Sequence, residues 1–202
     1  MKKLILIGNK PIENDISSVI DSFDYVFRVN RMMNYGNTGE RIDGVFMGIY
    51  RDFVEEYKGG PFVDKFKTAG QIFISKSMKR LSSAYFDWTK WITAKQYNNL
   101  GIIDYSKYRS HFYNTSVCTS LRVLDYLISE ERWTREYEIW ICGLDVEDRA
   151  NILMTGDAWK NTTHSKKEAA EGEERYLKEK LNSGVIKRLG DDGKEIKYCN
   201  PS

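Results

Sequence analysis

The chain has 202 residues and a formal net charge of +2, with 41% hydrophobic and 30% charged residues. This length is enough for one domain with a real core, and the composition is that of a soluble globular protein. The near-neutral charge argues against a dedicated nucleic-acid-binding protein, which usually carries a strong basic excess. No apolar run approaches the roughly 20 residues that a membrane span needs.

The amino terminus and the cysteines indicate a reducing compartment. The chain opens with a methionine and two lysines, as signal peptides do, but its first apolar stretch ends after four residues at Gly8. Cys118, Cys142 and Cys199 are odd in number and lack the spacing of a metal site. We therefore expect free thiols and a cytoplasmic protein, and leave open a peripheral contact with the inner face of the membrane.

Two short apolar segments near the start of the chain are each followed by an asparagine. Residues 4–7 form a continuous apolar run, typical of a strand buried inside a parallel sheet, and Asn9 follows it. A short helix is predicted over 15–21, and a second strand over 25–30 ends in Asn30. Open α/β sheets bind ligands beyond the carboxyl ends of their strands, so both amide groups are candidates for contacting a base, ribose or phosphate. The alternative is that both asparagines simply close turns.

The remaining segments continue the alternation of strands and helices. Further strands are predicted over 44–48, 71–75 and 137–143. Helices are predicted over 52–58, from 114–116 onward and over 164–181, and mixed helix and loop over 77–96. The chain is predicted to end in a final strand or a hairpin over 185–189 and 195–199, with a turn at 191–193. Residues 146–163 lack periodicity and form a long loop for a compact domain, which is typical of a lid. The sequence therefore predicts one Rossmann-like α/β domain over 1–202, with a mainly parallel sheet flanked by helices and a lid loop at 146–163.

Two positions carry groups suited to a phosphate or to proton transfer. Thr115 and Ser116 are good helix caps, and a helix N-terminus presents free N–H groups and partial positive charge to an anion. The chain has two histidines, His111 and His164. His164 lies between the irregular loop and a helix N-terminus, where the neutral, proton-accepting imidazole is favoured. The alternative for His164 is a surface residue near a helix cap, and His111 is interpreted as a packed loop residue.

Several of these segments, in order along the chain, resemble the CMP-sialic-acid-dependent sialyltransferases. They are the opening strand with Gly8-Asn9, the Phe27-Arg28-Val29-Asn30 strand, residues 113–116, the strand 139–145 ending in Gly-Leu-Asp, the segment beginning at His164, and the ending 196–202. The bacterial enzymes of glycosyltransferase family 42 are the nearest group, and family 29 shares the first two segments. These segments cover about half of the chain.

The resemblance implies a single Rossmann-like domain of a GT-A-like variant and an inverting, metal-free transferase. An acceptor hydroxyl would attack the anomeric carbon of the sugar in CMP-sialic acid, with no cofactor beyond this donor. The implied partners are a nucleotide-sugar donor and an oligosaccharide or glycolipid acceptor in glycan biosynthesis, without nucleic acid; homo-oligomer formation is left open. The residue roles implied by position are nucleotide contacts for Asn9 and Asn30, donor-sugar contacts for Thr115 and Ser116, lining of the cytidine site for Gly143 and Asp145, and general base for His164.

Two positions depart from the family pattern. The bacterial enzymes use lid tyrosines to stabilise the departing phosphate, whereas residues 146–163 contain none. The available substitutes are Arg149, Trp159 and Lys160, and the two cations among them would offset leaving-group charge. Lys10 replaces a small residue and either contacts a phosphate or points to solvent. Two other functions stay open: a transferase of the same fold that uses another nucleotide sugar, and a nucleotide- or glycan-binding protein without catalysis.

Overall fold

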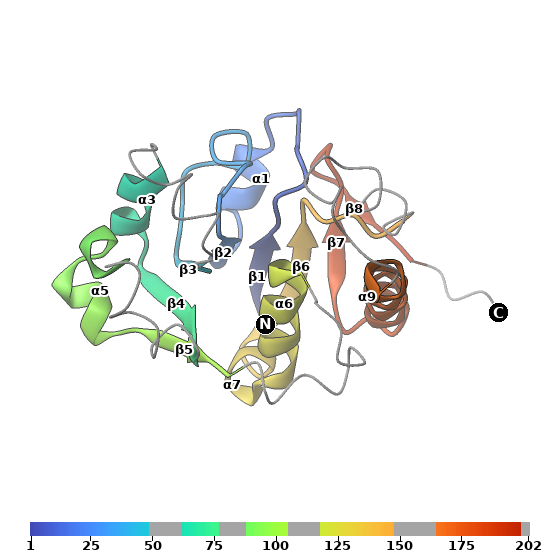
Figure 1. The fold of residues 1–202 in the computed structure, drawn as a ribbon. Coiled ribbons are helices and arrows are strands. Elements are labelled where there is room, and N and C mark those ends of the chain that lie inside the picture. Colours follow the sequence, from blue (N-terminus) through green and yellow to red (C-terminus); the bar gives the residue numbers. More distant parts are fainter. Residues whose placement is uncertain (49–61, 77–87, 105–117, 148–164, 199–202) are drawn as a thin grey trace.

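The computed structural model describes residues 1–48, 62–76, 88–104, 118–147 and 165–198. They form an α/β structure around an eight-stranded sheet of order β5-β4-β3-β2-β1-β6-β7-β8 (Figure 1). The strands are β1 (Lys2–Ile7), β2 (Tyr25–Val29), β3 (Gly44–Phe46), β4 (Gln71–Ser75), β5 (Gly101–Ile103), β6 (Tyr137–Cys142), β7 (Lys187–Leu189) and β8 (Glu195–Ile196). All neighbouring strands are parallel except β7 and β8, so the prediction of a mainly parallel sheet is confirmed.

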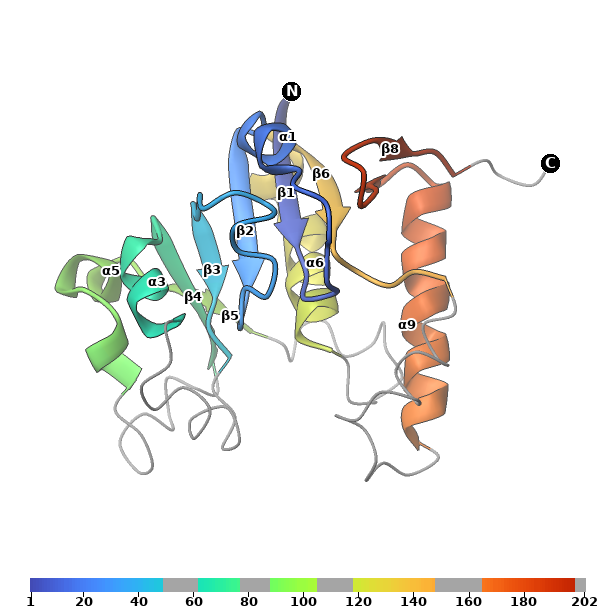
Figure 2. The same cartoon turned by 90° about the horizontal axis from the view of Figure 1, so that it is seen from above.

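Helices cover both faces of the sheet. One face carries α1 (Ser17–Asp21), α3 (Phe62–Thr68), the 3-10 helix η1 (Trp88–Trp91) and α5 (Ala94–Asn98), and the other carries α6 (Thr119–Ser129), α7 (Glu131–Thr134) and α9 (Ser165–Asn182). Figure 2 shows α1 and α3 in front of the sheet and α6 behind it. Alternate residues of β1 enter the two layers: Leu4 and Leu6 pack with α6, and Ile5 and Ile7 with α1.

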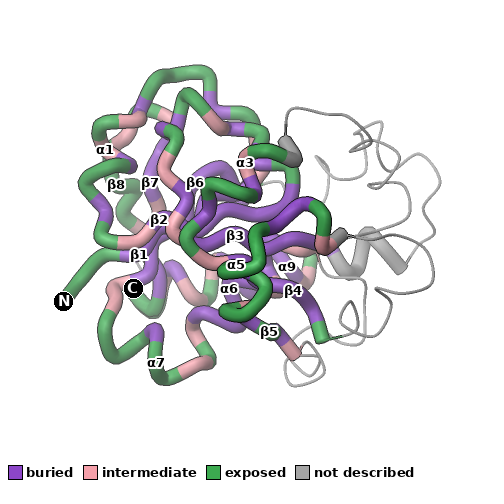
Figure 3. Tube along the Cα trace, turned by 90° about the vertical axis from the view of Figure 1, so that its left-hand side faces the viewer, coloured by how far each residue is buried: buried purple, intermediate pink, exposed green. Residues whose placement is uncertain are grey.

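The central strands are buried on both faces, as their apolar sequences predict. Leu4, Ile5 and Leu6 have no exposed surface, and Figure 3 shows most of the sheet in the colour of buried residues. A parallel sheet covered on both sides leaves no strand face for water, which explains why the runs are continuous rather than alternating. Each fully buried large aliphatic side chain stabilises the fold by about 1.5–3 kcal/mol relative to an exposed one.

Arg28 is an exception among these buried apolar residues, because its guanidinium lies inside the protein. It donates hydrogen bonds to the Thr38 hydroxyl (2.8 Å) and to the carbonyls of Thr38 (2.7 Å), Gly39 (2.9 Å) and Arg41 (2.9 Å). Burial lowers the pKa of Arg28 to about 10, so the group stays charged at neutral pH. The arginine thereby fixes the loop between β2 and β3. This loop runs from the carboxyl edge of the sheet back to the amino edge, where Arg41 donates to the Phe23 carbonyl (2.7 Å).

The structure corrects the sequence predictions at several elements. Helix α6 begins at Thr119, and its N-cap Cys118 has an extended backbone with ψ of 152°, so the prediction that 114–116 open this helix is wrong. The short elements β5, α3 and α7 were not predicted, and β3 ends at Phe46 rather than at residue 48. The predicted hairpin is confirmed as β7 and β8, and α9 confirms the helix predicted over 164–181. The predicted helix 52–58 lies outside the described residues.

Candidate functional site

The sheet has a topological switch point between β1 and β6. From β1 the chain moves outward through β2 to β5 and then returns to β6 on the other side of β1. The chain leaves β1 towards α1 on one face and leaves β6 towards α9 on the other. Open α/β sheets bind ligands outside the carboxyl ends of the strands at such a point. The loops that follow β1 and β6 are therefore the candidate functional site.

Two glycines let these loops touch. The Gly8 N–H donates to the Cys142 carbonyl (2.8 Å), and the Lys10 N–H donates to the Gly143 carbonyl (2.9 Å). A Cβ added at Gly8 would lie 2.3 Å from the Gly143 oxygen. Gly143 itself has a φ of +62°, in the left-handed region that favours glycine. The structure thus brings together two predicted site segments that are far apart in the sequence.

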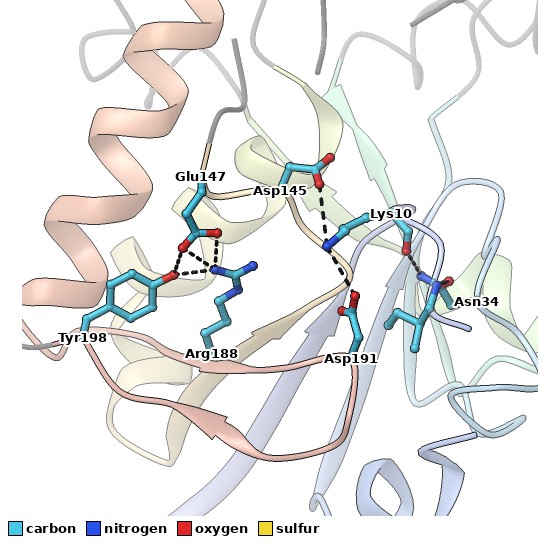
Figure 4. A network of polar contacts seen from close by, with 8 residues as sticks. Lys10, Asn34, Asp145, Glu147, Arg188, Asp191 and Tyr198 are labelled. Atoms are coloured by element: carbon cyan, nitrogen blue, oxygen red, sulfur yellow. Dashed lines mark hydrogen bonds and ion pairs between the residues drawn. The ribbon is translucent and has the colours of Figure 1, made fainter. Parts of the chain in front are cut away.

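Asn34 joins a third loop to this contact, and sequence reasoning did not single it out. Its amide nitrogen donates to the carbonyls of Lys10 (2.7 Å, Figure 4) and Gly8 (2.9 Å). Its oxygen accepts from the Ile12 N–H (2.9 Å). The side chain is buried, and a Cβ at Gly143 would lie 2.8 Å from its nitrogen. The available signal was the concentration of amides in residues 31–39, which identifies the loop but not the residue.

Asn9 and Asn30 lie at this edge, as predicted, and both also hold loops. The Asn9 side-chain oxygen accepts from the Met33 N–H (3.3 Å), and that of Asn30 accepts from the Gly48 N–H (2.9 Å). Asn30 also has a φ of +44°, which asparagine tolerates better than most residues. The turn-closing interpretation therefore accounts for both oxygens. Neither NH₂ group donates a hydrogen bond within the described part of the chain, and Asn30 is buried, with 8% of its surface exposed.

Charged groups from three segments meet beside the glycine contact. The Lys10 ammonium lies 3.3 Å from the Asp191 carboxylate and 3.9 Å from that of Asp145 (Figure 4). Asp191 belongs to the turn between β7 and β8, and its carbonyl accepts from the Asn14 side chain (3.1 Å). Asp145, predicted to line a nucleotide site, thus lies next to the loop that follows β1.

A second charged cluster fixes the start of the predicted lid. The Arg188 guanidinium donates to both carboxylate oxygens of Glu147 (2.7 Å each), and the Tyr198 hydroxyl donates to Glu147 (2.5 Å) (Figure 4). Burial raises the pKa of Glu147, but the hydrogen bonds and the charge of Arg188 outweigh this effect and lower the pKa to about 2. The cluster anchors the first residues of the loop after β6 to β7 and to the chain after β8.

Replacing Glu147 with glutamine should make the free energy of unfolding less dependent on pH in the acid range. Because the pKa of the folded state is depressed, the carboxylate stabilises the fold above the ordinary value of 4.5, and this contribution disappears as the pH falls towards 2. The Glu147 side chain is 58% exposed, so solvent screening limits the contribution to about 1 kcal/mol. Urea unfolding should therefore show E147Q to be less stable at pH 7, with the difference from wild type shrinking towards pH 3.

The matched control is E131Q, which removes a carboxylate paired with Arg135 on a surface where both side chains are at least 70% exposed. This change should alter stability by less than about 0.5 kcal/mol at either pH. A difference between E147Q and wild type that is the same at pH 7 and pH 3 would contradict the role of the Glu147 carboxylate.

Helices α6 and α9 are tied together by buried polar contacts. The Glu173 carboxylate accepts from the Cys118 N–H (2.5 Å) at the start of α6, and the Tyr176 hydroxyl donates to Asp125 (2.5 Å). Since Glu173 lies eight residues after Ser165, the first two turns of α9 extend about 12 Å beyond the start of α6. Figure 2 shows this extension on the side to which the arrowheads of β1 and β6 point.

The other predicted site residues lie outside the described residues: Thr115, Ser116, Arg149, Lys160 and His164, together with most of the lid prediction 146–163. They occupy the segments that end at α6 and at α9. The tie between these two helices fixes the described ends of both segments relative to each other.

Among the described residues, no cluster of three histidine, cysteine or acidic side chains is arranged to hold a metal ion. Their helices include none with an apolar stretch long enough to cross a membrane. Within the described ranges, Cys118 and Cys142 form no disulfide, whereas Cys199 lies outside them. The chain matches no known protein-family model, and no curated protein matches it.

Proposed function

We propose that this protein is a metal-independent, inverting glycosyltransferase that resembles the sialyltransferases and transfers an acidic sugar from a CMP-activated donor to a glycan acceptor. The observation that carries the proposal is the contact between the Gly8 and Gly143 loops at the switch point. Both glycines belong to segments that carry the resemblance, and a nucleotide site of this fold class is expected at that point.

The proposal gives each candidate residue a role, and the roles of the described residues fit their geometry. The NH₂ groups of Asn9 and Asn30 donate to uncharged or anionic oxygens of the nucleotide, since their own oxygens already accept loop N–H groups. Gly143 keeps its loop close to that of Gly8, and Asp145 accepts from hydroxyl or amino groups of the nucleoside. Thr115 and Ser116 hold the donor sugar, and Arg149 and Lys160 offset charge on the leaving group.

His164 is the general base in this proposal. Its ring nitrogen takes the proton of the acceptor hydroxyl while that oxygen bonds to the anomeric carbon. The bond from this carbon to the phosphate oxygen breaks, and CMP leaves with the electron pair. Attack opposite the leaving group inverts the configuration. No metal takes part, because side-chain and backbone donors meet the phosphate charge.

The finer features of fold and setting belong to the same proposal. We infer a GT-A-like variant of the Rossmann-like fold in one domain, with residues 146–163 as a lid over the bound donor. The acceptor is an oligosaccharide or a glycolipid, and a glycolipid acceptor would bring a cytoplasmic protein to the inner face of the membrane. Homo-oligomer formation is compatible with this arrangement.

Calorimetric titration of the purified protein with CMP, UMP and GMP in the presence of EDTA tests the proposal. CMP should bind at least about tenfold more tightly than the other two, a free-energy difference of about 1.4 kcal/mol. Preferential binding of UMP or GMP would show that the donor carries another nucleotide, while the proposed nucleotide site would stand. Equal weak binding of all three, or no binding, would refute the proposal.

A further inference from the structure

Lys10 stands at the centre of the candidate site on a fixed stretch of backbone. Its N–H donates to the Gly143 carbonyl (2.9 Å), and its carbonyl accepts from the buried Asn34 amide (2.7 Å). Its backbone is therefore fixed at the contact between the loops after β1 and β6. The long side chain extends from this point to the acidic groups of two other segments.

The ion pairs that hold the Lys10 ammonium are weak enough to exchange. Asp191 lies at 3.3 Å with its side chain 45% exposed, Asp145 lies at 3.9 Å, and the Lys10 side chain is 33% exposed. Partly exposed pairs of this kind contribute about 1 kcal/mol or less. The phosphate of free or departing CMP carries up to two negative charges and three terminal acceptor oxygens, so the ammonium prefers it to the solvated carboxylate of Asp191.

We propose that Lys10 binds the phosphate of the nucleotide and stabilises the charge on departing CMP, and that Asp191 holds the ammonium while no nucleotide is bound. This inference rests on the proposed function and adds to it a further cation, which acts on the leaving group together with Arg149 and Lys160. A cation supplied by the loop after β1 would do the work that tyrosines of the lid do in the enzymes this chain resembles. It would also explain why residues 146–163 contain no tyrosine.

Asp191 is placed to compete with the phosphate for the Lys10 ammonium rather than to bind the nucleotide itself. It sits in the turn of the β7–β8 hairpin, which the Asn14 side chain ties to the loop after β1 through the Asp191 carbonyl (3.1 Å). This bond uses the backbone, so the carboxylate can release Lys10 without moving the hairpin. Its negative charge would repel a bound phosphate, and neutralising it should favour the nucleotide.

Binding of CMP and cytidine to three variants tests this proposal. Wild type should bind CMP more tightly than cytidine, and K10M should lose about tenfold or more in CMP affinity while its cytidine affinity stays unchanged, because only the phosphate contact disappears. K10R should retain part of the CMP preference, since it keeps the charge. D191N should raise the affinity for CMP by about twofold to fivefold, the effect of a pair worth up to 1 kcal/mol.

K194M is the matched control, because Lys194 lies in the same hairpin, pairs with Asp192 and has its side chain 83% exposed. It should leave both affinities unchanged, and thermal unfolding should show that each variant is folded. A K10M protein that keeps the preference for CMP over cytidine would overturn the role of Lys10 while leaving the proposed function intact. Weaker CMP binding by D191N would overturn the competitor role. A wild type that binds neither compound would refute the proposed function, and with it this inference.

Discussion

Gly8→Ala should destabilise the protein by about 3 kcal/mol and abolish nucleotide binding. The added methyl would lie 2.3 Å from the Gly143 carbonyl oxygen and 2.9 Å from the Leu144 side chain, so backbone must move. Overpacking of this kind costs about 1–3 kcal/mol, and the two loop hydrogen bonds at 2.8 and 2.9 Å that would lengthen contribute about 1 kcal/mol each. Urea unfolding measures the loss of stability, and calorimetry with CMP measures the loss of binding.

Gly172→Ala is the matched control for this substitution. Gly172 lies in α9, and a Cβ there would meet no atom within 4 Å apart from its chain neighbours and the backbone of its own helix. Alanine favours a helix over glycine by up to about 1 kcal/mol, so this variant should be as stable as wild type or slightly more stable. A Gly8→Ala protein with wild-type stability and CMP affinity would show that the two loops separate without cost, and the site would lose its structural basis.

The parts of the fold that the sequence predicted best are those determined locally. The run at residues 4–7 has no polar residue that could lie on a solvent-exposed face of the sheet. A strand buried on both sides was therefore expected, and it is observed. The turn over 191–193, with a glycine at its end, likewise predicted the β7–β8 hairpin. The carboxyl-edge argument then placed Asn9 and Asn30 correctly, because it depends only on strand direction.

The errors occur where distant residues decide the local structure. The cap-forming residues at 114–116 favoured a helix start, yet α6 begins after Cys118, whose N–H is bound by Glu173 from 55 residues away. Local cap preferences carry no information about such a partner. Strand β5 has three residues and forms only because β4 offers it an edge. A segment this short has no periodicity to detect.

The candidate site shows the same division. The edge on which Gly143 and Asp145 lie was predictable from the strand that precedes them, whereas their contact with the β1 loop was not. That contact depends on the return of the chain to β6 beside β1, which strand patterns alone do not specify. The contacts of Asn34 and the ion pairs of Lys10 depend on the same tertiary arrangement. Residue types therefore indicated the candidates, and the topology decided which of them come together.

His164→Ala should lower turnover by about 10²–10⁴-fold while leaving CMP affinity unchanged. General bases contribute about this factor, and in the proposed reaction the imidazole acts on the acceptor hydroxyl rather than on the nucleotide. The assay follows release of CMP from CMP-sialic acid, with water or an oligosaccharide as acceptor. The wild-type rate should fall about tenfold per pH unit below the imidazole pKa, about 6.5 in an unperturbed histidine, because only the neutral ring accepts a proton.

The other histidine, His111, supplies the matched control. H111A should keep both the wild-type rate near neutral pH and the fall in rate at lower pH, whereas H164A should lack that fall because no imidazole is left to titrate in the site. Loss of turnover with loss of CMP binding in H164A would indicate a role in holding the donor instead. Full turnover in H164A would remove the general base from the mechanism and leave the switch-point residues as a nucleotide-binding site whose chemistry depends on another group.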